Sequence, residues 1–256
     1  MSTMSSSADS RIALAGRNLT KVYGSGESAV RALSDVSLDI PPGQFTAIMG
    51  PSGSGKSTLL HILAGLEEPT SGHVEVSGAN LTTMSENERT ELRRDHIGFV
   101  FQSYNLVPHF SARQNITLPL DLAGRTINDA DLTRITDALS LTDRLEHLPS
   151  ELSGGQQQRT AIARALITDP DVIMADEPTG NLDNRTSAEV LSLLRSAVRE
   201  FGQTLVLVTH DPMAAAYADN VLLLTDGTIA GTVEHPSYDS VVTALDALRA
   251  VNSSVV

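Results

Sequence analysis

The sequence predicts an α/β fold in which helices cover a mainly parallel sheet. Continuous apolar runs typical of buried strands, at 44–49, 171–175 and 204–208, alternate with stretches of helical periodicity. A glycine-rich loop joins the first of these strands to a helix. Between 103 and 152 the chain carries three prolines and no strong strand pattern, so we expect a mostly helical subdomain inserted there.

Two strands are expected before the glycine-rich loop, at 12–22 and 32–40. In the second strand Val36, Leu38 and Ile40 alternate with polar residues and therefore share one face. We expect these strands to belong to an N-terminal antiparallel β part.

The remaining elements follow from turn, cap and periodicity signals. The loop helix is expected at 57–66. Before the helical insertion we then expect a strand at 72–78 and a second strand at 97–101. Between these two strands, the capping box Ser85–Glu88 predicts the start of a helix that ends near Arg94. After the insertion we expect helices at 153–166 and 186–201, a hairpin at 221–233 that turns at Asp226–Gly227, and a short helix at 237–250.

Composition limits the class of protein. With 256 residues, 41% of them hydrophobic, the chain can form one large domain with a real core. A formal net charge of −13 disfavours a general nucleic-acid binder. No run approaches the roughly 18 apolar residues of a membrane span, and the serine-rich first ten residues contain no secretory signal. The absence of cysteine excludes disulfides and thiolate chemistry, and it fits the cytosol.

The glycine-rich loop matches the phosphate-binding pattern G-x-x-x-x-G-K-[ST] in its required strand–loop–helix setting. Glycines let the backbone close around phosphate oxygens, and the N–H groups of a helix start favour an anion. Lys56 can reach the β- and γ-phosphates, and the Ser57 hydroxyl suits Mg²⁺. We therefore predict a nucleotide triphosphatase that binds phosphate through Gly50, Pro51, Ser52, Gly53, Ser54, Gly55, Lys56, Ser57 and Thr58.

Two carboxylates follow the apolar strand at 171–175. Enzymes with this phosphate loop need an acid at such a strand end to position Mg²⁺, and Asp176 is the natural candidate. Because strand side chains alternate, we expect Glu177 to point elsewhere, where it could orient or deprotonate the attacking water.

At 152–156 the chain contains Leu152, Ser153, Gly154, Gly155 and Gln156. A helix cap explains the serine, but glycine early in a helix costs about 1 kcal/mol relative to alanine. The two glycines expose a second set of N–H donors suited to phosphate. This stretch resembles the LSGGQ signature of the ATP-binding subunits of ABC transporters, and the resemblance covers about residues 11–233.

The resemblance implies a RecA-like P-loop NTPase core and a role for each further motif. Tyr23 matches the aromatic that stacks on adenine, and Gln102 the glutamine that helps to arrange Mg²⁺ with Ser57 and Asp176. Glu177 and His210 match the catalytic glutamate and the histidine that contacts the γ-phosphate, so the implied catalytic residues are Glu177, His210 and Gln102. Asp183 in Asn181–Asp183 matches the residue that communicates across a dimer.

One copy of each motif implies a site split between two chains. The resemblance places each ATP between the P-loop of one subunit and the signature of the other, most simply in a homodimer. It also implies a separate integral-membrane permease, which makes the chain peripheral to the cytoplasmic face of the membrane. We expect the permease to dock near Gln102–Phe110, because the stretch from Tyr104 is apolar for a surface loop; the alternative is that this stretch is subdomain core.

Segments such as 101–108, 116–120 and 175–183 are similar to the MacB/LolD/FtsE lineage. That similarity implies an exporter of lipoprotein, peptide, antibiotic or haem, or instead an FtsE-like ATPase that signals to cell-wall enzymes without transport. The expected domain plan is a disordered tail at 1–10, an ATPase domain at 11–235 and an extension at 236–256 without an assigned role. Within the ATPase domain the core covers 11–102 and 165–235, and the helical subdomain about 103–164.

Overall fold

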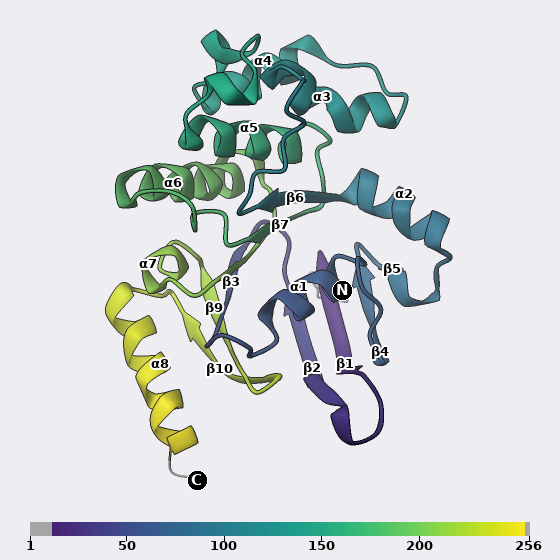
Figure 1. Ribbon diagram of the computed structural model, residues 1–256, viewed down its shortest axis with the longest axis vertical. Coiled ribbons are helices and arrows are strands. Elements are labelled where there is room, and N and C mark those ends of the chain that lie inside the picture. Colours follow the sequence, from purple (N-terminus) through teal and green to yellow (C-terminus); the bar gives the residue numbers. More distant parts are fainter. Residues whose placement is uncertain (1–11, 254–256) are drawn as a thin grey trace, which may run out of the picture.

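The computed structural model describes residues 12–253, so the tail expected at 1–10 lies outside the described residues. Among the residues it describes, no helix combines the length and apolarity that a membrane crossing requires. The strands form two sheets, and helices cover the larger one (Figure 1).

The smaller sheet is antiparallel and confirms the expected N-terminal β part. Its order is β2-β1-β4-β5, formed by β1 (Leu14–Tyr23), β2 (Val30–Ile40), β4 (Ser71–Val76) and β5 (Ala79–Asn80). The larger sheet has the order β10-β9-β3-β8-β7-β6. It contains β3 (Phe45–Met49), β6 (Ile97–Phe101), β7 (Val172–Asp176), β8 (Leu205–Thr209), β9 (Asn220–Thr225) and β10 (Thr228–Glu234). All its pairings are parallel except the β9–β10 hairpin.

Strand periodicity divides the core between the two faces of the larger sheet. On β3, Phe45, Ala47 and Met49 join one buried cluster, whereas Ile48 joins the other. The first cluster packs under the helices α3 (Ala112–Leu122), α4 (Asp129–Ala138), α5 (Gly154–Leu166), α6 (Asn184–Phe201) and α7 (Pro212–Ala215). The second packs against α1 (Lys56–Leu63), α2 (Glu86–His96) and the antiparallel sheet. The sheet is therefore covered on both faces, as parallel strands require.

Most element boundaries differ from the expectations by only a few residues, and two of the differences have local reasons. The loop helix ends at Leu63 and not at Leu66, because Gly65 adopts a left-handed φ of 64° and leaves Leu66 49% exposed. Helix α6 begins at Asn184, two residues early, because the Asp183 carboxylate accepts the backbone N–H groups of Arg185 and Thr186.

Helices α3 to α5 lie between β6 and β7 along the chain and form the upper part of Figure 1. This matches the expected helical character of 103–164, whereas the exact limits of a subdomain stay a prediction. The C-terminal helix α8 (Tyr238–Ser253) lies beside β10 at the opposite end of the molecule (Figure 1).

Candidate active site

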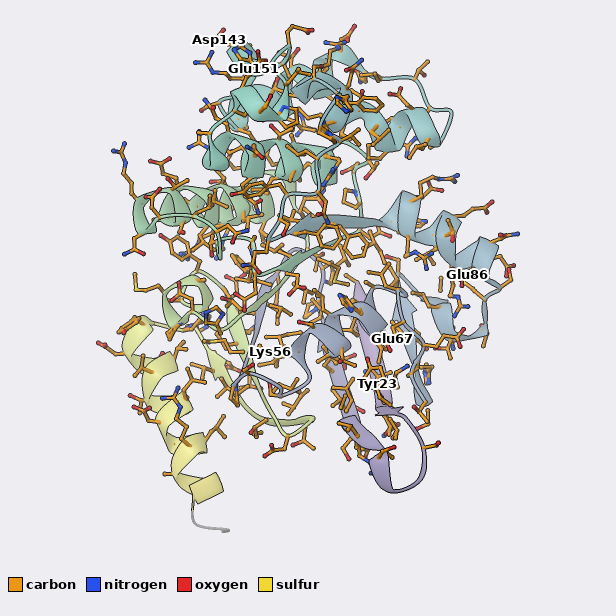
Figure 2. The ribbon with its side chains drawn as sticks, viewed as in Figure 1. Tyr23, Lys56, Glu67, Glu86, Asp143 and Glu151 are labelled. Carbon is orange, nitrogen blue, oxygen red and sulfur yellow. The ribbon has the colours of Figure 1, made fainter. Side chains whose placement is uncertain are left out.

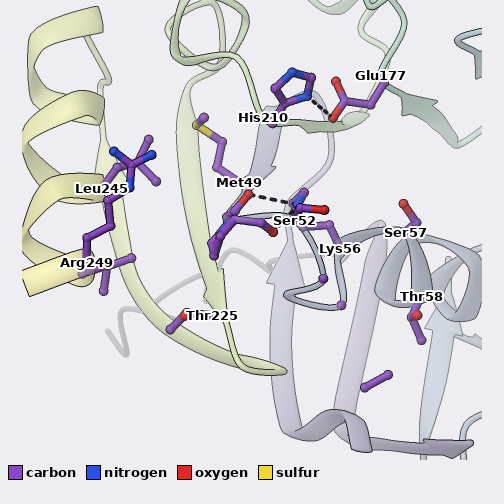
Figure 3. A pocket seen from close by; sticks show the side chains of 16 residues that line it. Met49, Ser52, Lys56, Ser57, Thr58, Glu177, His210, Thr225, Leu245 and Arg249 are labelled. Atoms are coloured by element: carbon purple, nitrogen blue, oxygen red, sulfur yellow. Dashed lines mark hydrogen bonds and ion pairs between the residues drawn. The ribbon is translucent and has the colours of Figure 1, made fainter. Parts of the chain in front are cut away.

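The P-loop borders a cavity of about 650 Å³ at the carboxyl end of β3 (Figure 3). The loop contributes the residues from Met49 to Thr58 except Ser54. Glu177 and His210 follow β7 and β8 and line the same cavity. Ser54 is buried beneath the loop, where its carbonyl accepts the Gly227 N–H at 3.1 Å, so its side chain does not face the cavity.

Two glycines let this loop pack directly on neighbouring backbone. A Cβ on Gly50 would lie 1.9 Å from the Leu224 carbonyl oxygen. A Cβ on Gly55 would lie 2.4 Å from the Ala32 carbonyl oxygen, and the Gly55 φ of 98° is itself strained for any other residue. The shape of the loop is therefore specified by backbone contacts that only glycine allows.

Lys56 is held at the centre of the loop. Its ammonium donates to the carbonyl oxygens of Gly50 at 2.9 Å and Pro51 at 2.8 Å, and the residue is 9% exposed. Burial lowers the pKa of Lys56, while the nearby carboxylates of Glu177 and Asp176 act in the opposite direction. The negative charge of a bound phosphate would therefore stabilise the buried Lys56 ammonium.

Asp176 ends β7 as a partly buried carboxylate. Among the described residues its Oδ1 atom has no hydrogen-bond partner, and burial raises the pKa of the side chain. A partnerless buried carboxylate oxygen is suited to a cation. Mg²⁺ in nucleotide sites is bound through one or two carboxylates together with phosphate oxygens, so the single Asp176 with the Ser57 hydroxyl fits that ion.

Glu177 turns away from Asp176 towards His210. The turn comes from a left-handed φ of 46° at Glu177, not from the simple strand alternation that we expected, because the strand ends at Asp176. The Glu177 Oε1 atom lies 2.7 Å from Nδ1 of His210 (Figure 3). Thr209 Oγ1 lies 3.4 Å from the other carboxylate oxygen of Glu177. The pair therefore presents an oriented carboxylate to the cavity.

Tyr23 and Gln102 lie outside the residues that line this cavity. The Tyr23 hydroxyl donates to Glu67 at 2.7 Å and lies 3.4 Å from the Thr58 Oγ1 atom, so the ring sits beyond the Thr58 end of the P-loop (Figure 2). Burial raises the pKa of Tyr23. The Gln102 amide donates to the Asn181 side-chain oxygen at 3.3 Å and does not line the cavity with Ser57.

The signature residues also lie away from the P-loop cavity. Ser153 and Gln156 form a reciprocal capping box at the start of α5, which the Ser-x-x-Gln spacing could have predicted. The two glycines have a packing role as well. A Cβ on Gly154 would lie 3.0 Å from the Tyr104 hydroxyl, and one on Gly155 would lie 2.6 Å from the Thr186 methyl group. Leu152 is buried beside them.

Substitution of Asp176 by Asn tests the electrostatics of this strand end. Because the folded-state pKa of Asp176 is raised, its ionised form costs the folded state free energy above the unfolded-state pKa, and this cost disappears as the carboxyl protonates at lower pH. Without nucleotide, Asp176→Asn should therefore raise the thermal midpoint at pH 8, with a gain that narrows as the pH is lowered towards about 4, the pKa of an aspartate in an unfolded chain.

Thermal unfolding by calorimetry measures this gain, and Glu200→Gln on the exposed surface of α6 is the matched control. A gain of the same size for both variants, or one that does not change with pH, would contradict the assignment of a desolvated carboxylate at 176.

Comparison with known proteins identifies the family. A family model described as ABC transporter matches residues 33–180. The chain is 46% identical over 214 residues to the macrolide export ATP-binding/permease protein MacB of Salmonella typhimurium, which covers 83% of this chain and 33% of MacB. It therefore spans about a third of the length of these MacB relatives.

A shorter relative and a solved structure agree. The lipoprotein-releasing system ATP-binding protein LolD of Legionella pneumophila is 44% identical over 220 residues, covering 85% of this chain and 97% of LolD. The dimeric ATP-binding cassette MJ0796, in a post-hydrolysis state bound to ADP and Pi, superposes with a TM-score of 0.78 at 40% identity, covering 88% of this chain and 99% of the other. This chain belongs to the ABC transporter family, as one of its ATP-hydrolysing nucleotide-binding domains.

Proposed function

We propose that this chain energises a separate membrane permease by ATP-driven closure of a homodimer. The observation that carries the proposal is that the residues expected to act on ATP lie in two separate places. The P-loop, Glu177 and His210 share one cavity, whereas the signature residues at the start of α5 lie outside it. A second copy of the chain would bring its own signature to the open side of that cavity, and a solved relative at 40% identity is dimeric.

In the proposed mechanism, the residues of the cavity and its surroundings each have a separate role in binding ATP and Mg²⁺. Lys56 exchanges its bonds to the loop carbonyls for bonds to the β- and γ-phosphates, and the loop N–H groups hold the remaining oxygens. Ser57 and Asp176 would hold Mg²⁺, which neutralises charge on the phosphates, and Gln102 would join them after leaving Asn181. Tyr23 would stack on adenine at the Thr58 end of the loop.

Glu177 is the residue that activates water in this mechanism. Its carboxylate is partly exposed at 20% of the side-chain surface, and His210 holds it in one orientation at 2.7 Å. The Glu177 carboxylate takes a proton from water as that water attacks the γ-phosphorus, the bond from this phosphorus to the β–γ bridging oxygen breaks, and ADP leaves. His210 would contact the γ-phosphate. Ser153 and the N–H groups of Gly154 and Gly155 would bind the γ-phosphate from the other subunit, and Asp183 would connect the two sites.

The first test is Glu177→Gln. Removal of a general base costs about 100-fold or more in rate, but the amide preserves shape, so ATP binding and dimer closure should persist. We expect a monomer without nucleotide, a stable dimer with Mg-ATP by light scattering, and ATP turnover reduced at least ~100-fold. A monomer that still hydrolysed ATP at the wild-type rate would contradict both the role of Glu177 and the split site.

The permease is proposed to dock in an apolar groove of about 390 Å³, which we call the docking groove. Its apolar lining comes from β6 and α3 and includes Phe99, Phe101, Leu118, Pro119 and Leu122. Leu122 is 75% exposed, which is unusual for a large apolar side chain unless a partner covers it. We expected the permease to dock near 102–110, and Asn105 of that stretch lines this groove. Arg164, which also lines the groove, donates hydrogen bonds to the carbonyl oxygens of Tyr104 and Asn105. The apolar residues of that stretch are half-buried or exposed, which favours a surface role over a core role.

Substitution of Leu122 by Glu tests this docking groove. The side chain is exposed, so the fold should tolerate the change, whereas burial of the carboxylate against an apolar permease segment is unfavourable. We expect the fraction of the chain that sediments with membranes of its own cells to fall at least tenfold. Val30→Glu, at a 63% exposed apolar position on β2, is the matched control and should sediment as wild type. Equal sedimentation of both variants would contradict docking at this groove.

Within the family we propose a MacB-like exporter function at the cytoplasmic face of the membrane. The support is 46% identity to a macrolide export protein and 44% identity to a lipoprotein-releasing ATPase, whose cargoes differ. Lipoprotein, peptide, antibiotic and haem therefore remain the candidate cargoes. An FtsE-like regulatory ATPase is the second candidate, and reconstitution with the partner permease separates the two, because only an exporter would move a solute on ATP hydrolysis.

A further inference from the structure

Arg164 on α5 differs from the other arginines that are partly withdrawn from solvent. Among the described residues, the other half-buried arginines each have a carboxylate oxygen within 3.4 Å, and they are Arg17, Arg89, Arg93, Arg113 and Arg159. Arg164 is half-buried as well, but no carboxylate of the described residues pairs with it. The chain contains 31 acidic residues, so the missing partner is not explained by its composition.

Two backbone carbonyls hold the Arg164 guanidinium in place. Its Nη2 donates to the Tyr104 carbonyl oxygen at 2.7 Å, and its Nη1 donates to the Asn105 carbonyl oxygen at 2.6 Å. Tyr104 and Asn105 have left-handed φ angles of 59° and 50°, which a tyrosine disfavours, so these bonds fix the turn and the guanidinium together. The other N–H groups of the guanidinium have no hydrogen-bond partner among the described residues.

This guanidinium lines the docking groove. Arg93 and Arg94 line the same groove, but each already has a carboxylate, Glu86 at 3.4 Å and Asp95 at 2.7 Å. Burial lowers the pKa of Arg164, which means that its charge is poorly hydrated in this apolar setting. An anion that entered the groove beside Arg164 would therefore be stabilised there.

The surroundings of Lys56 show what such an arrangement can receive. Lys56 is also a buried cation that donates to two backbone carbonyls and has no carboxylate partner within ion-pair distance among the described residues. Its expected anion is the nucleotide phosphate, which arrives from outside the chain. At Arg164 the neighbouring surface is apolar, so a protein segment with apolar side chains and a carboxylate fits the groove better than a hydrated phosphate does.

We propose that the permease segment in the docking groove carries an aspartate or glutamate whose carboxylate pairs with Arg164. The inference rests on the proposed docking of a permease and adds the chemistry of the segment that docks. Its apolar side chains would cover Phe99, Leu118 and Leu122, and its acidic residue would face α5. A segment without that acid would bury Arg164 unpaired and bind less tightly, so Arg164 would select among permeases.

Substitution of Arg164 by Lys makes the partner carboxylate detectable. A carbodiimide condenses an amine with a carboxylate in direct contact and leaves no spacer between them. The chain has only two other lysines, Lys21 and Lys56, so few competing links can form. Arg195→Lys, at an exposed position on α6, is the matched control. Each variant is bound to membranes of its own cells and treated with carbodiimide, and the linked peptides are identified by mass spectrometry.

We expect an amide from position 164 to an aspartate or glutamate in an integral-membrane protein, about tenfold or more above any link from position 195. Arg164→Glu should also lower the fraction of the chain that sediments with these membranes by about tenfold or more, because two carboxylates would then face each other. Arg164→Lys keeps the charge and should sediment within about threefold of wild type.

Three results would overturn the inference. One is the absence of any link from position 164 in membranes that bind the chain, and another is a link only to a second copy of this chain. The third is Arg164-dependent sedimentation with protein-free phosphatidylglycerol vesicles, because a lipid headgroup would then be the anion. Leu122→Glu in the same experiment separates the two levels of the proposal. If it sediments as wild type, the docking groove itself fails, whereas its loss without a link from position 164 removes only the carboxylate.

Discussion

The close approach of the P-loop backbone to β2 and to the β9–β10 turn is the contact on which the rest of the site depends. Gly50 and Gly55 allow this close approach because they have no Cβ atom. The hydrogen bond from the Gly227 N–H to the Ser54 carbonyl oxygen joins the loop to the β9–β10 turn. Because this contact joins the antiparallel sheet, the parallel sheet and the loop, the cradle is rigid before nucleotide arrives. Rigid donors cost little reorganisation during phosphoryl transfer, which is mainly positioning and charge stabilisation.

Several charged side chains of the site are suited to bind a phosphate or a cation. Asp176 presents a buried oxygen without a partner among the described residues, and Lys56 bonds to its own loop. Glu177 and His210 hold each other at the mouth of the cavity. In the proposed dimer, phosphate, cation and the second subunit would complete these groups, and the binding energy would favour closure of the two subunits.

The fold was predictable because its signals are local. Apolar strand runs, the capping box at Ser85 and the Asp226–Gly227 turn each specify an element by periodicity or backbone preference, and the structure confirms them. Contacts between distant segments were not predictable in this way. The left-handed turn at Glu177, the packing of Gly154 on Tyr104, the hydrogen bond from Gln102 to Asn181 and the position of α8 at the cavity all depend on residues far apart in the chain. The catalytic and binding roles of the site residues remain predictions.

The central claim is that one ATP site needs two chains, and mixing two inactive variants tests it most directly. Lys56→Ala removes phosphate binding, and Ser153→Asp keeps a helix cap while placing a negative charge at the signature. Each variant alone should be inactive. A 1:1 mixture should recover up to about a quarter of wild-type ATP turnover, because about half of the randomly formed dimers are mixed and each mixed dimer retains one intact site of two. An inactive mixture of well-folded chains that dimerise, or full activity of Ser153→Asp alone, would contradict the claim.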